Sequence, residues 1–249
     1  MKLKGKIAVI TGATGGIGRE LVESLDKEGV TCVLVGRNKD KLEQLSKSLD
    51  SPIKKYYVGD FSSDNQIADL AKKVAKEFSR VDLLVNLAGI GVYKLFENVT
   101  YKDWQDSLNI GVTSAYFLTR QLLPNLQRSD LALVLNVGSG AGIYGMPGRS
   151  VYSMTKFAFR GMTLSLAEEF RGFKPDFCLI TLGSVLTEFG PMTLEDKYEQ
   201  MQAGKAYFTP EWVVKKFVEI IKDPKRETEY TLFPSNYFGG KWNPPKIIS

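Results

Sequence analysis

Short apolar runs alternate along the chain with longer segments in which apolar residues recur every three or four positions. Most of the runs are continuously apolar, which is typical of strands buried on both faces of a parallel sheet. They predict strands at Ile7–Thr11, Thr31–Gly36, Lys54–Val58, Leu83–Asn86, Leu131–Val137, Phe177–Leu182 and Tyr230–Phe233. The segments of helical period predict helices at about 16–28, 39–49, 64–79, 103–127, 151–171 and 210–222.

This regular alternation of strands and helices predicts an α/β fold. Repeated β-α units give a Rossmann-type, doubly wound parallel sheet of about seven strands with helices on both faces. Because no linker or repeat divides residues 1–249, we expect a single domain. The segment at about 183–209 breaks the rhythm just after a strand, where a substrate lid would sit. An irregular tail is expected at about 234–249.

Composition narrows the classes of function. Of the 249 residues, 43% are hydrophobic and 24% charged, as in ordinary globular proteins. The chain has no histidine, which excludes a Ser-His-Asp triad and a histidine-based zinc site. Its two cysteines, Cys32 and Cys178, stand in apolar runs without metal-ligand spacing, so we expect no metal. No apolar run reaches the ~18–20 residues of a membrane span, and the expected location is cytoplasmic.

The charged residues argue against nucleic acid and membrane partners. The net charge is +5, from 33 basic and 28 acidic residues, and the sequence pI is about 9.0. Basic residues are dispersed and mixed with acids along helical segments, as in DKLEQLSK and AKKVAKEF. We interpret these segments as solvated helix faces, because a nucleic-acid site needs a clustered basic patch. The expected partner is a small molecule.

A glycine-rich turn follows the first predicted strand and opens the next helix, with the sequence TGATGGIG at 11–18. Gly12 permits a tight turn, while Gly16 and Gly18 allow a pyrophosphate to approach the backbone closely. The helix N-terminus adds N–H donors and the positive end of the helix dipole. This context predicts a dinucleotide site that includes Gly12, Thr14, Gly16, Ile17 and Gly18.

The second predicted strand ends at Gly36, followed by Arg37 and Asn38. Sites for NAD(H) usually carry an acid here that binds the adenosine ribose hydroxyls. Gly36 cannot do this, whereas Arg37 can pair with a 2′-phosphate. We therefore expect Arg37 and Asn38 to contact NADP(H) rather than NAD(H). The alternative is that Arg37 is an ordinary surface arginine at the end of a strand.

Further motifs follow at strand and helix ends. They are Asn86-Leu87-Ala88-Gly89, Asn109-Ile110-Gly111, Ser139 within NVGSGAG, and Tyr152-Ser153-Met154-Thr155-Lys156. Together with TGATGGIG, this ordered set resembles the short-chain dehydrogenase/reductase family from Lys4 to about Thr187. Tyr152 and Lys156 are four residues apart on a predicted helix and so share one face. A second YxxxK, at Tyr237–Lys241, stands in a glycine-rich tail and is interpreted as accidental.

The chemistry of these groups supports the reduction of a carbonyl. Hydride transfer to a carbonyl develops negative charge on oxygen, which needs a proton and hydrogen bonds. A tyrosine with its usual pKa of about 10 is a weak base at neutral pH. A nearby Lys156 ammonium and the nicotinamide charge would favour the phenolate and lower that pKa. Tyr152 is therefore expected to be the acid in reduction and the base in oxidation, with Ser139 bonding the substrate oxygen.

The resemblance assigns further roles. It implies that Lys156 also holds the nicotinamide ribose and that Asn109 anchors a water linking Lys156 to solvent. The segment Leu182–Thr187 resembles the family's PGxVxT, with Leu182 in place of proline. The remaining cofactor contacts implied are Asp60 and Phe61 at the adenine, Asn86, Ala88 and Gly89, and Val185 and Thr187 at the carboxamide.

Each of these residues also has a plainer interpretation. Asn109 could bond the backbone within its own helix, and Ser139 could be a turn serine between glycines. Asp60 could be an acid at the start of a helix. Agreement of Asn109, Ser139, Tyr152 and Lys156 in order and context favours the catalytic interpretation.

Aromatic and methionine residues near the lid suggest an apolar pocket for a lipophilic ketone or aldehyde. The candidates are Tyr93, Phe96, Tyr144, Met146, Phe189, Met192, Tyr198, Tyr207 and Phe208. The alternative is that half of them only pack the lid onto the body. The C-terminus lacks the glycine-rich ending typical of the family's acyl-carrier-protein reductases, which argues against fatty-acid elongation. The resemblance also implies a homodimer or homotetramer through the segments at about 103–127 and 151–171.

The sequence thus predicts an NADP(H)-dependent oxidoreductase that interconverts a carbonyl and an alcohol. One alternative is an NAD-linked alcohol or polyol dehydrogenase, against which Arg37 argues. Another is a protein that senses a dinucleotide without turnover, against which the four candidate catalytic residues argue. The physiological substrate is left open.

Overall fold

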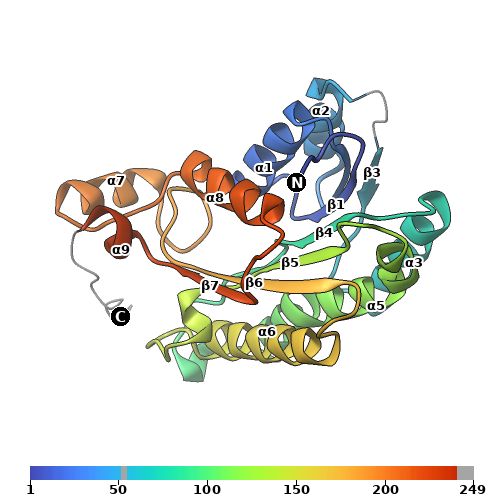
Figure 1. The fold of residues 1–249 in the computed structure, drawn as a ribbon. Helices are drawn as coiled ribbons and strands as arrows, with labels where there is room; N and C mark the ends of the chain where they lie inside the picture. Colours follow the sequence, from blue (N-terminus) through green and yellow to red (C-terminus); the bar gives the residue numbers. More distant parts are fainter. Residues whose placement is uncertain (52–54, 240–249) are drawn as a thin grey trace.

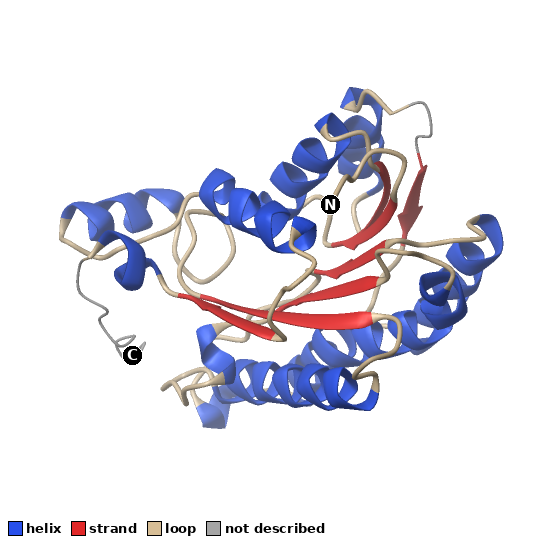
Figure 2. Ribbon diagram, viewed as in Figure 1, coloured by secondary structure: helices blue, strands red, loops and turns tan. Residues whose placement is uncertain are grey.

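The computed structural model describes residues 1–51 and 55–239, and its centre is one seven-stranded parallel sheet (Figures 1 and 2). The strands are β1 (Ile7–Thr11), β2 (Thr31–Gly36), β3 (Lys55–Val58), β4 (Leu83–Asn86), β5 (Leu133–Val137), β6 (Asp176–Leu182) and β7 (Glu229–Leu232). Their order is β3-β2-β1-β4-β5-β6-β7, and every neighbouring pair is parallel. The strand order reverses between β1 and β4, as in a doubly wound fold. The predicted fold class is confirmed, with each strand end within two residues; Lys54 lies outside the described residues.

Helices cover both faces of this sheet (Figure 1). They are α1 (Gly16–Lys27), α2 (Lys39–Ser48), α3 (Asp64–Glu77), α4 (Tyr101–Leu108), α5 (Ser114–Gln127), α6 (Ser150–Glu169), α7 (Leu194–Gln202), α8 (Pro210–Lys222) and α9 (Pro234–Phe238). Alternation along β1 shows the two layers. Ala8 and Ile10 pack with the apolar residues of α1, α2 and α8, whereas Val9 packs with those of α3 and α5. A continuously apolar strand is therefore buried on both sides.

The long helix predicted at about 103–127 is wrong in one respect. The structure contains α4, then a π-helical turn over Asn109–Thr113, then α5. The turn lies where this segment crosses α6: a Cβ on Gly111 would stand 2.5 Å from Thr155 Cγ2, and the hydroxyls of Ser107 and Thr155 are 2.8 Å apart. Hydrophobic periodicity does not reveal one inserted residue, and such turns are frequent at functional sites.

The segment predicted as a lid leaves β6 and returns to the sheet edge before α8. Its two ends are paired by the Val185–Phe208 bridge, and Phe208 N–H donates to Ser184 O at 2.9 Å. Between them lies α7, capped reciprocally by Thr193 and Asp196. The helix is short and carries no broad apolar stripe, so periodicity missed it, although Thr-x-x-Asp is related to a capping signal.

The tail from residue 234 is not wholly irregular, because α9 begins at Pro234. That proline occupies the first helical position, where its missing N–H costs nothing. Lys241 of the second YxxxK and the rest of the predicted tail lie outside the described residues.

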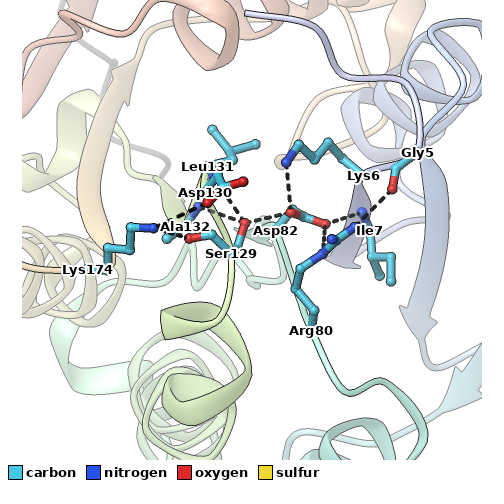
Figure 3. A network of polar contacts seen from close by, with 10 residues as sticks. All are labelled: Gly5, Lys6, Ile7, Arg80, Asp82, Ser129, Asp130, Leu131, Ala132 and Lys174. Atoms are coloured by element: carbon cyan, nitrogen blue, oxygen red, sulfur yellow. Dashed lines mark hydrogen bonds and ion pairs between the residues drawn. The ribbon is translucent and has the colours of Figure 1, made fainter.

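A polar network joins the amino ends of the central strands (Figure 3). The fully buried carboxylate of Asp82, just before β4, accepts from Ile7 N–H at 2.8 Å and from the Ser129 hydroxyl at 2.5 Å. Lys6 and Arg80 form ion pairs with it at 3.3 and 3.1 Å. The network connects β1, β4 and the loop before β5 at the amino ends of these strands. None of the helices in the described part of the chain is long and apolar enough to cross a membrane.

Candidate active site

A cavity of about 300 Å³ lies at the carboxyl ends of the strands, whereas the Asp82 network lies at their amino ends. Segments that follow β1, β4, β5, β6 and β7 all reach it, and the start of α6 and the lid complete its wall. The lining comes from within 12–18, 87–93, 137–156, 182–192, 197–207 and 233–235. This is where ligands bind in open parallel sheets.

The glycine-rich turn forms one end of the cavity and packs tightly against its neighbours. Gly12 has a φ of +68°, and a Cβ there would stand 3.0 Å from Ala88 N. On Gly16 a Cβ would meet Thr187 Cγ2 at 2.7 Å, and on Gly18 it would meet Gly12 O at 2.2 Å. Only glycine fits at Gly12 and Gly18, where the opposing atoms belong to the backbone.

This turn fits the pyrophosphate of a dinucleotide. Helix α1 begins at Gly16 and therefore directs its first unpaired N–H groups and positive dipole end into the cavity. Gly12, Gly16, Ile17 and Gly18 line the cavity, and their contact with a cofactor stays a prediction. Thr14 does not; its hydroxyl lies beside Gly36 at the end of β2, 3.5 Å from where a Cβ would stand.

The loop after β4 forms a second wall. The Thr11 hydroxyl accepts the N–H groups of Leu87 and Ala88, each at 3.1 Å, and so holds this loop against β1. Gly89 lines the cavity, whereas Ala88 and Asn86 do not. Asn86 is buried and donates its amide to Asn136 at 2.8 Å.

Three predicted catalytic side chains meet in the cavity. Tyr152 and Lys156 lie one turn apart on α6, and Ser139 follows β5. Tyr152 is buried, and the Ser139 hydroxyl is hydrogen-bonded to it. The Lys156 ammonium lies 5.9 Å from the centre of the Tyr152 ring and 3.5 Å from Val137 O. The ammonium also lies close to Gly89, because a Cβ built on that glycine would stand 3.5 Å from Lys156 Nζ.

The fourth predicted catalytic residue, Asn109, hydrogen-bonds to a loop elsewhere in the fold. It opens the π-helical turn after α4, and its Nδ2 donates to Ser62 O in the β3–α3 loop at 2.9 Å. The bond is therefore not within its own helix, contrary to the plainer interpretation. Asn109 does not line the cavity, and its proposed link to a water stays a prediction.

The residues predicted at the adenosine end lie beyond the cavity. Arg37 is exposed after β2, close enough to Asp60 for its charge to contribute to the lowered pKa of that carboxyl, although hydrogen bonds from Ser62 contribute more. Asn38 caps α2 by accepting Lys41 N–H at 2.9 Å. Phe61 is buried in the layer between the sheet and α3.

Comparison with known protein families matches residues 6–197 to short chain dehydrogenases. That is more than three quarters of the chain, and it spans the glycine turn, Ser139, Tyr152 and Lys156. The chain belongs to the short-chain dehydrogenase/reductase family. The resemblance drawn from its motifs is confirmed, and the family is one of oxidoreductases.

Individual members of the family are similar over most of their length. The 3-oxoacyl-[acyl-carrier-protein] reductase FabG of Thermotoga maritima is 32% identical over 174 residues, which cover 69% of this chain and 71% of that protein. A short chain dehydrogenase from Shigella flexneri, complexed with NADP, is 25% identical with a TM-score of 0.79 over 93% of this chain and 97% of its own. The alcohol dehydrogenase of the archaeon Thermococcus sibiricus, complexed with 5-hydroxy-NADP, is 26% identical with a TM-score of 0.78 over 91% and 95%.

Burial dominates the protonation of the two central groups in this short-chain dehydrogenase/reductase. It raises the pKa of Tyr152, while the hydrogen bond from Ser139 and the charge of Arg149 lower it. Burial also lowers the pKa of Lys156 to about 8. We had expected the Lys156 charge to lower the pKa of Tyr152; the cation that acts on this phenol in the structure is Arg149, and burial outweighs it.

Six of the nine residues predicted to face the substrate line the cavity. They are Tyr93, Tyr144, Met146, Phe189, Met192 and Tyr207. Phe96 is 83% exposed and Tyr198 is half-exposed, both outside the lining. Phe208 is fully buried and stacks on Trp212 at 4.1 Å, so it holds the base of the lid. The alternative that some of these residues only pack is therefore right for Phe208.

Three basic residues of this pocket, Arg149, Lys197 and Lys205, are not predicted by the sequence motifs. From the sequence alone, dispersed basic residues are interpreted as parts of solvated faces. The position of Arg149, three residues before Tyr152 and so close to the same helix face, was an available signal. The lysines come from the lid, whose path no periodicity predicts.

Proposed function

We propose that this protein is an NADP(H)-dependent oxidoreductase that interconverts a carbonyl and an alcohol, with Tyr152 as the acid/base. The observation that carries the proposal is the meeting of Tyr152, Ser139 and Lys156 in one cavity with the glycine turn and the N-terminus of α1. A dinucleotide on that turn would reach towards the phenol, because the glycine turn, Ser139 and the start of α6 all lie at the carboxyl ends of the strands.

A nicotinamide cofactor held by the glycine turn and Lys156 would supply a hydride to the substrate carbon in reduction and accept one in oxidation. Tyr152 gives its proton to the substrate oxygen during reduction and takes it back during oxidation. Its raised pKa keeps the phenol protonated at neutral pH, which suits the reductive direction. The Ser139 hydroxyl orients the same oxygen and stabilises the charge that develops on it.

Lys156 has two proposed roles at this site. Its ammonium borders Gly89 at the end of β4, where it could bond the nicotinamide ribose. Together with the positive charge of an oxidised nicotinamide, its ammonium 5.9 Å from the ring would also favour the Tyr152 phenolate during proton transfer, in addition to the effect of Arg149. Asn109 supports the arrangement by fixing the π-helical turn to the β3–α3 loop.

The proposed preference for NADP(H) rests on the end of β2. Gly36 offers no carboxylate to a ribose, and the exposed Arg37 can reach an added phosphate. The Shigella flexneri and Thermococcus sibiricus structures, which are complexed with NADP and with 5-hydroxy-NADP, support this choice at 25% and 26% identity. An NAD-linked alcohol or polyol dehydrogenase is the alternative that the cofactor comparison below tests.

We also propose that the protein forms a homodimer or homotetramer through α4, α5 and α6. Large side chains on these helices are exposed, among them Tyr116, Phe117 and Phe157. Isolated apolar residues are common on surfaces, but a contiguous group favours an interface. Both cysteines are free and buried, which suits the proposed location in the reducing cytoplasm.

The experiment that tests the proposal follows the absorbance of NADPH and of NADH with the purified protein and a panel of aldehydes, ketones, diketones and quinones. We expect consumption of NADPH with a subset of these carbonyls and a much lower kcat/KM with NADH. A lower kcat/KM with NADPH than with NADH would support the NAD-linked alternative. Tight NADPH binding without turnover on any compound would support a dinucleotide sensor.

A further inference from the structure

The substrate side of the cavity is strongly cationic. Arg149, the residue just before α6, lines it, and so do Lys197 and Lys205 of the lid. Among residues 1–51 and 55–239, they and Lys156 are the four basic residues in the lining, and no aspartate or glutamate of these ranges lines it. The net charge of +5 is too small to make such a segregation of charge expected.

The side chains of Arg149, Lys197 and Lys205 form no ion pair within residues 1–51 and 55–239. Lys197 donates to the carbonyls of Thr187 and Phe189, at 2.5 and 2.7 Å. Lys205 donates to the Gln200 amide oxygen at 2.9 Å. All these partners are neutral.

Arg149 is held by still weaker contacts. Its guanidinium lies 5.1 Å from the centre of the Tyr93 ring, and Nη1 lies 3.6 Å from the sulfur of Met146. A guanidinium has five N–H donors, so most of its hydrogen-bonding capacity remains for a ligand. It is thus the cation best prepared to bind a planar anion.

The three charges also repel one another. Burial lowers the pKa of Lys205, and the positive charges of Arg149 and Lys197 lower it further. Burial likewise lowers the pKa of Lys197. Basic residues in protein interiors are usually paired, because leaving a desolvated charge without a counter-charge is costly. A bound anion would relieve both the desolvation and the repulsion.

The position of the cations relative to Tyr152 assigns that anion to the substrate. Arg149 is close enough to lower the pKa of the Tyr152 phenol, and the Tyr93 ring beneath it is 5.7 Å from the Tyr152 ring. The Phe189 ring of the lid is also near, 6.2 Å from that of Tyr152. The glycine turn, where a cofactor pyrophosphate would bind, is instead formed by the start of α1.

We propose that Arg149, Lys197 and Lys205 form a subsite that binds the carboxylate or phosphate group of an anionic carbonyl substrate. This inference rests on the proposed function, because it assigns the substrate class of the same site. Arg149 and Lys205 bind the anion, and Lys197, fixed to two lid carbonyls, holds the lid segment at the subsite. Tyr93 and Phe189 flank the carbon skeleton, so the substrate is a compact oxo acid or oxo phosphate rather than a neutral lipid.

Matched pairs of probes test this assignment. The first set is para-carboxybenzaldehyde, para-formylphenyl phosphate and the neutral methyl ester of the first compound. The second is succinic semialdehyde and its methyl ester, so that the result does not depend on one spacing. The kcat/KM of each is measured at saturating NADPH and constant ionic strength, for the wild type, Arg149→Met, Arg149→Lys, Lys205→Met and Arg128→Met. Arg128 donates to Ser79 O and lies outside the cavity, so it controls for net charge.

We expect the wild type to prefer at least one charged probe over its ester by about tenfold or more, as a desolvated charge pair would give. Arg149→Met and Lys205→Met should lose that preference through KM, Arg149→Lys should keep part of it, and Arg128→Met all of it. Preference for the carboxylate or for the phosphate probe identifies the anion. Equal kcat/KM for acid and ester in both sets, or an unchanged preference in Arg149→Met, would overturn the subsite while leaving carbonyl reduction intact.

A binding measurement separates this proposal from the proposed function. Calorimetry with para-carboxybenzaldehyde and the protein saturated with NADP⁺ detects the subsite without reduction. Binding that Arg149→Met weakens about tenfold, together with no turnover of any probe with NADPH, would reject the proposed reaction and keep the subsite. If Arg149→Met instead weakens NADPH binding and leaves probe binding unchanged, the cations serve the cofactor and the inference is wrong.

Discussion

The Lys156 ammonium lies 5.9 Å from the centre of the Tyr152 ring, one turn further along α6. Burial acts on the two groups in opposite directions: it raises the pKa of the phenol and lowers that of the ammonium to about 8. Both shifts favour the uncharged form, since a low-dielectric site disfavours any charge. The tyrosine therefore keeps its proton at neutral pH, and the lysine is held charged at a cost to the stability of the fold.

The first prediction follows from that cost. A lysine pKa lowered from 10.5 to about 8 corresponds to about 3 kcal/mol of destabilisation at pH 7. Lys156→Met, which has a similar volume and no charge, should raise the free energy of unfolding at pH 7 by up to that amount and lose turnover. Urea denaturation followed by circular dichroism measures the first effect.

The pH dependence has a definite sign. Below pH 8 the lysine is protonated in both the folded and the unfolded chain, so the full cost is present; above 10.5 it is neutral in both. The advantage of Lys156→Met over the wild type should therefore be largest up to pH 8 and shrink as the pH rises towards 10.5. A difference independent of pH over that interval would contradict this explanation.

The second prediction concerns cofactor choice at the end of β2. Arg37→Ala should raise the Kd for NADPH about 10- to 100-fold, the loss expected for one charge-assisted contact, and leave that for NADH unchanged. Gly36→Asp should favour NADH, and a Cβ there makes only ordinary contacts, 3.4 Å from Leu42 and 3.5 Å from Thr14. Fluorescence titration measures both constants, with Lys39→Ala as the control. Unchanged NADPH affinity in Arg37→Ala would remove the argument for NADP(H).

A third prediction concerns the network around Asp82 (Figure 3). Asp82→Ala should lower the free energy of unfolding by about 3 kcal/mol, because it leaves Ile7 N–H and the Ser129 hydroxyl without their acceptor and uncouples two cations. Asp130→Ala, whose carboxylate is 98% exposed and 3.8 Å from Lys174, is the control and should change it by less than about 0.5 kcal/mol. Since Asp82 lies at the amino ends of the strands and the cavity at their carboxyl ends, kcat should not change in the folded variant.

The fourth prediction tests the proposed interface. Phe117→Glu on α5 should shift the protein towards monomer, because it places a charge in an apolar contact. Phe173→Glu, in an exposed position after α6, replaces an even more exposed phenylalanine and should have no effect. Size-exclusion chromatography with light scattering reads out the mass. A wild type that is already monomeric would reject the proposed oligomer.

The sequence predicted the sheet closely because most of its strands are continuously apolar and end at, or just before, a glycine. Ile7–Thr11 and Thr31–Gly36 appear with their predicted bounds for that reason. Periodicity could not show the π-helical turn at Asn109–Thr113, since one inserted residue barely changes a helical pattern, or α7, whose helix is stabilised by its cap. The π-helical turn lies against Thr155 of α6, which is distant in the sequence, whereas α7 is marked only by its local cap.

At the site, the short motifs predicted the residues that follow strand ends, but not the charge of the pocket. Gly12, Ser139, Tyr152 and Lys156 reach the cavity because local turns and one helix face place them there. Arg149, Lys197 and Lys205 come together only through the path of the lid. Phe61 was expected at the adenine and is buried instead, because an aromatic after β3 fills the space above α3.

We propose that Tyr152 transfers the proton to a carbonyl oxygen, and a single substitution at this residue gives the sharpest test. Tyr152→Phe keeps the ring that packs against Tyr93 and Phe189 and removes only the hydroxyl. With any carbonyl that the wild type reduces, we expect kcat with NADPH to fall about 100- to 10,000-fold while the Kd for NADPH stays within about twofold. Reduction by Tyr152→Phe at close to the wild-type rate would contradict the assignment of the acid/base.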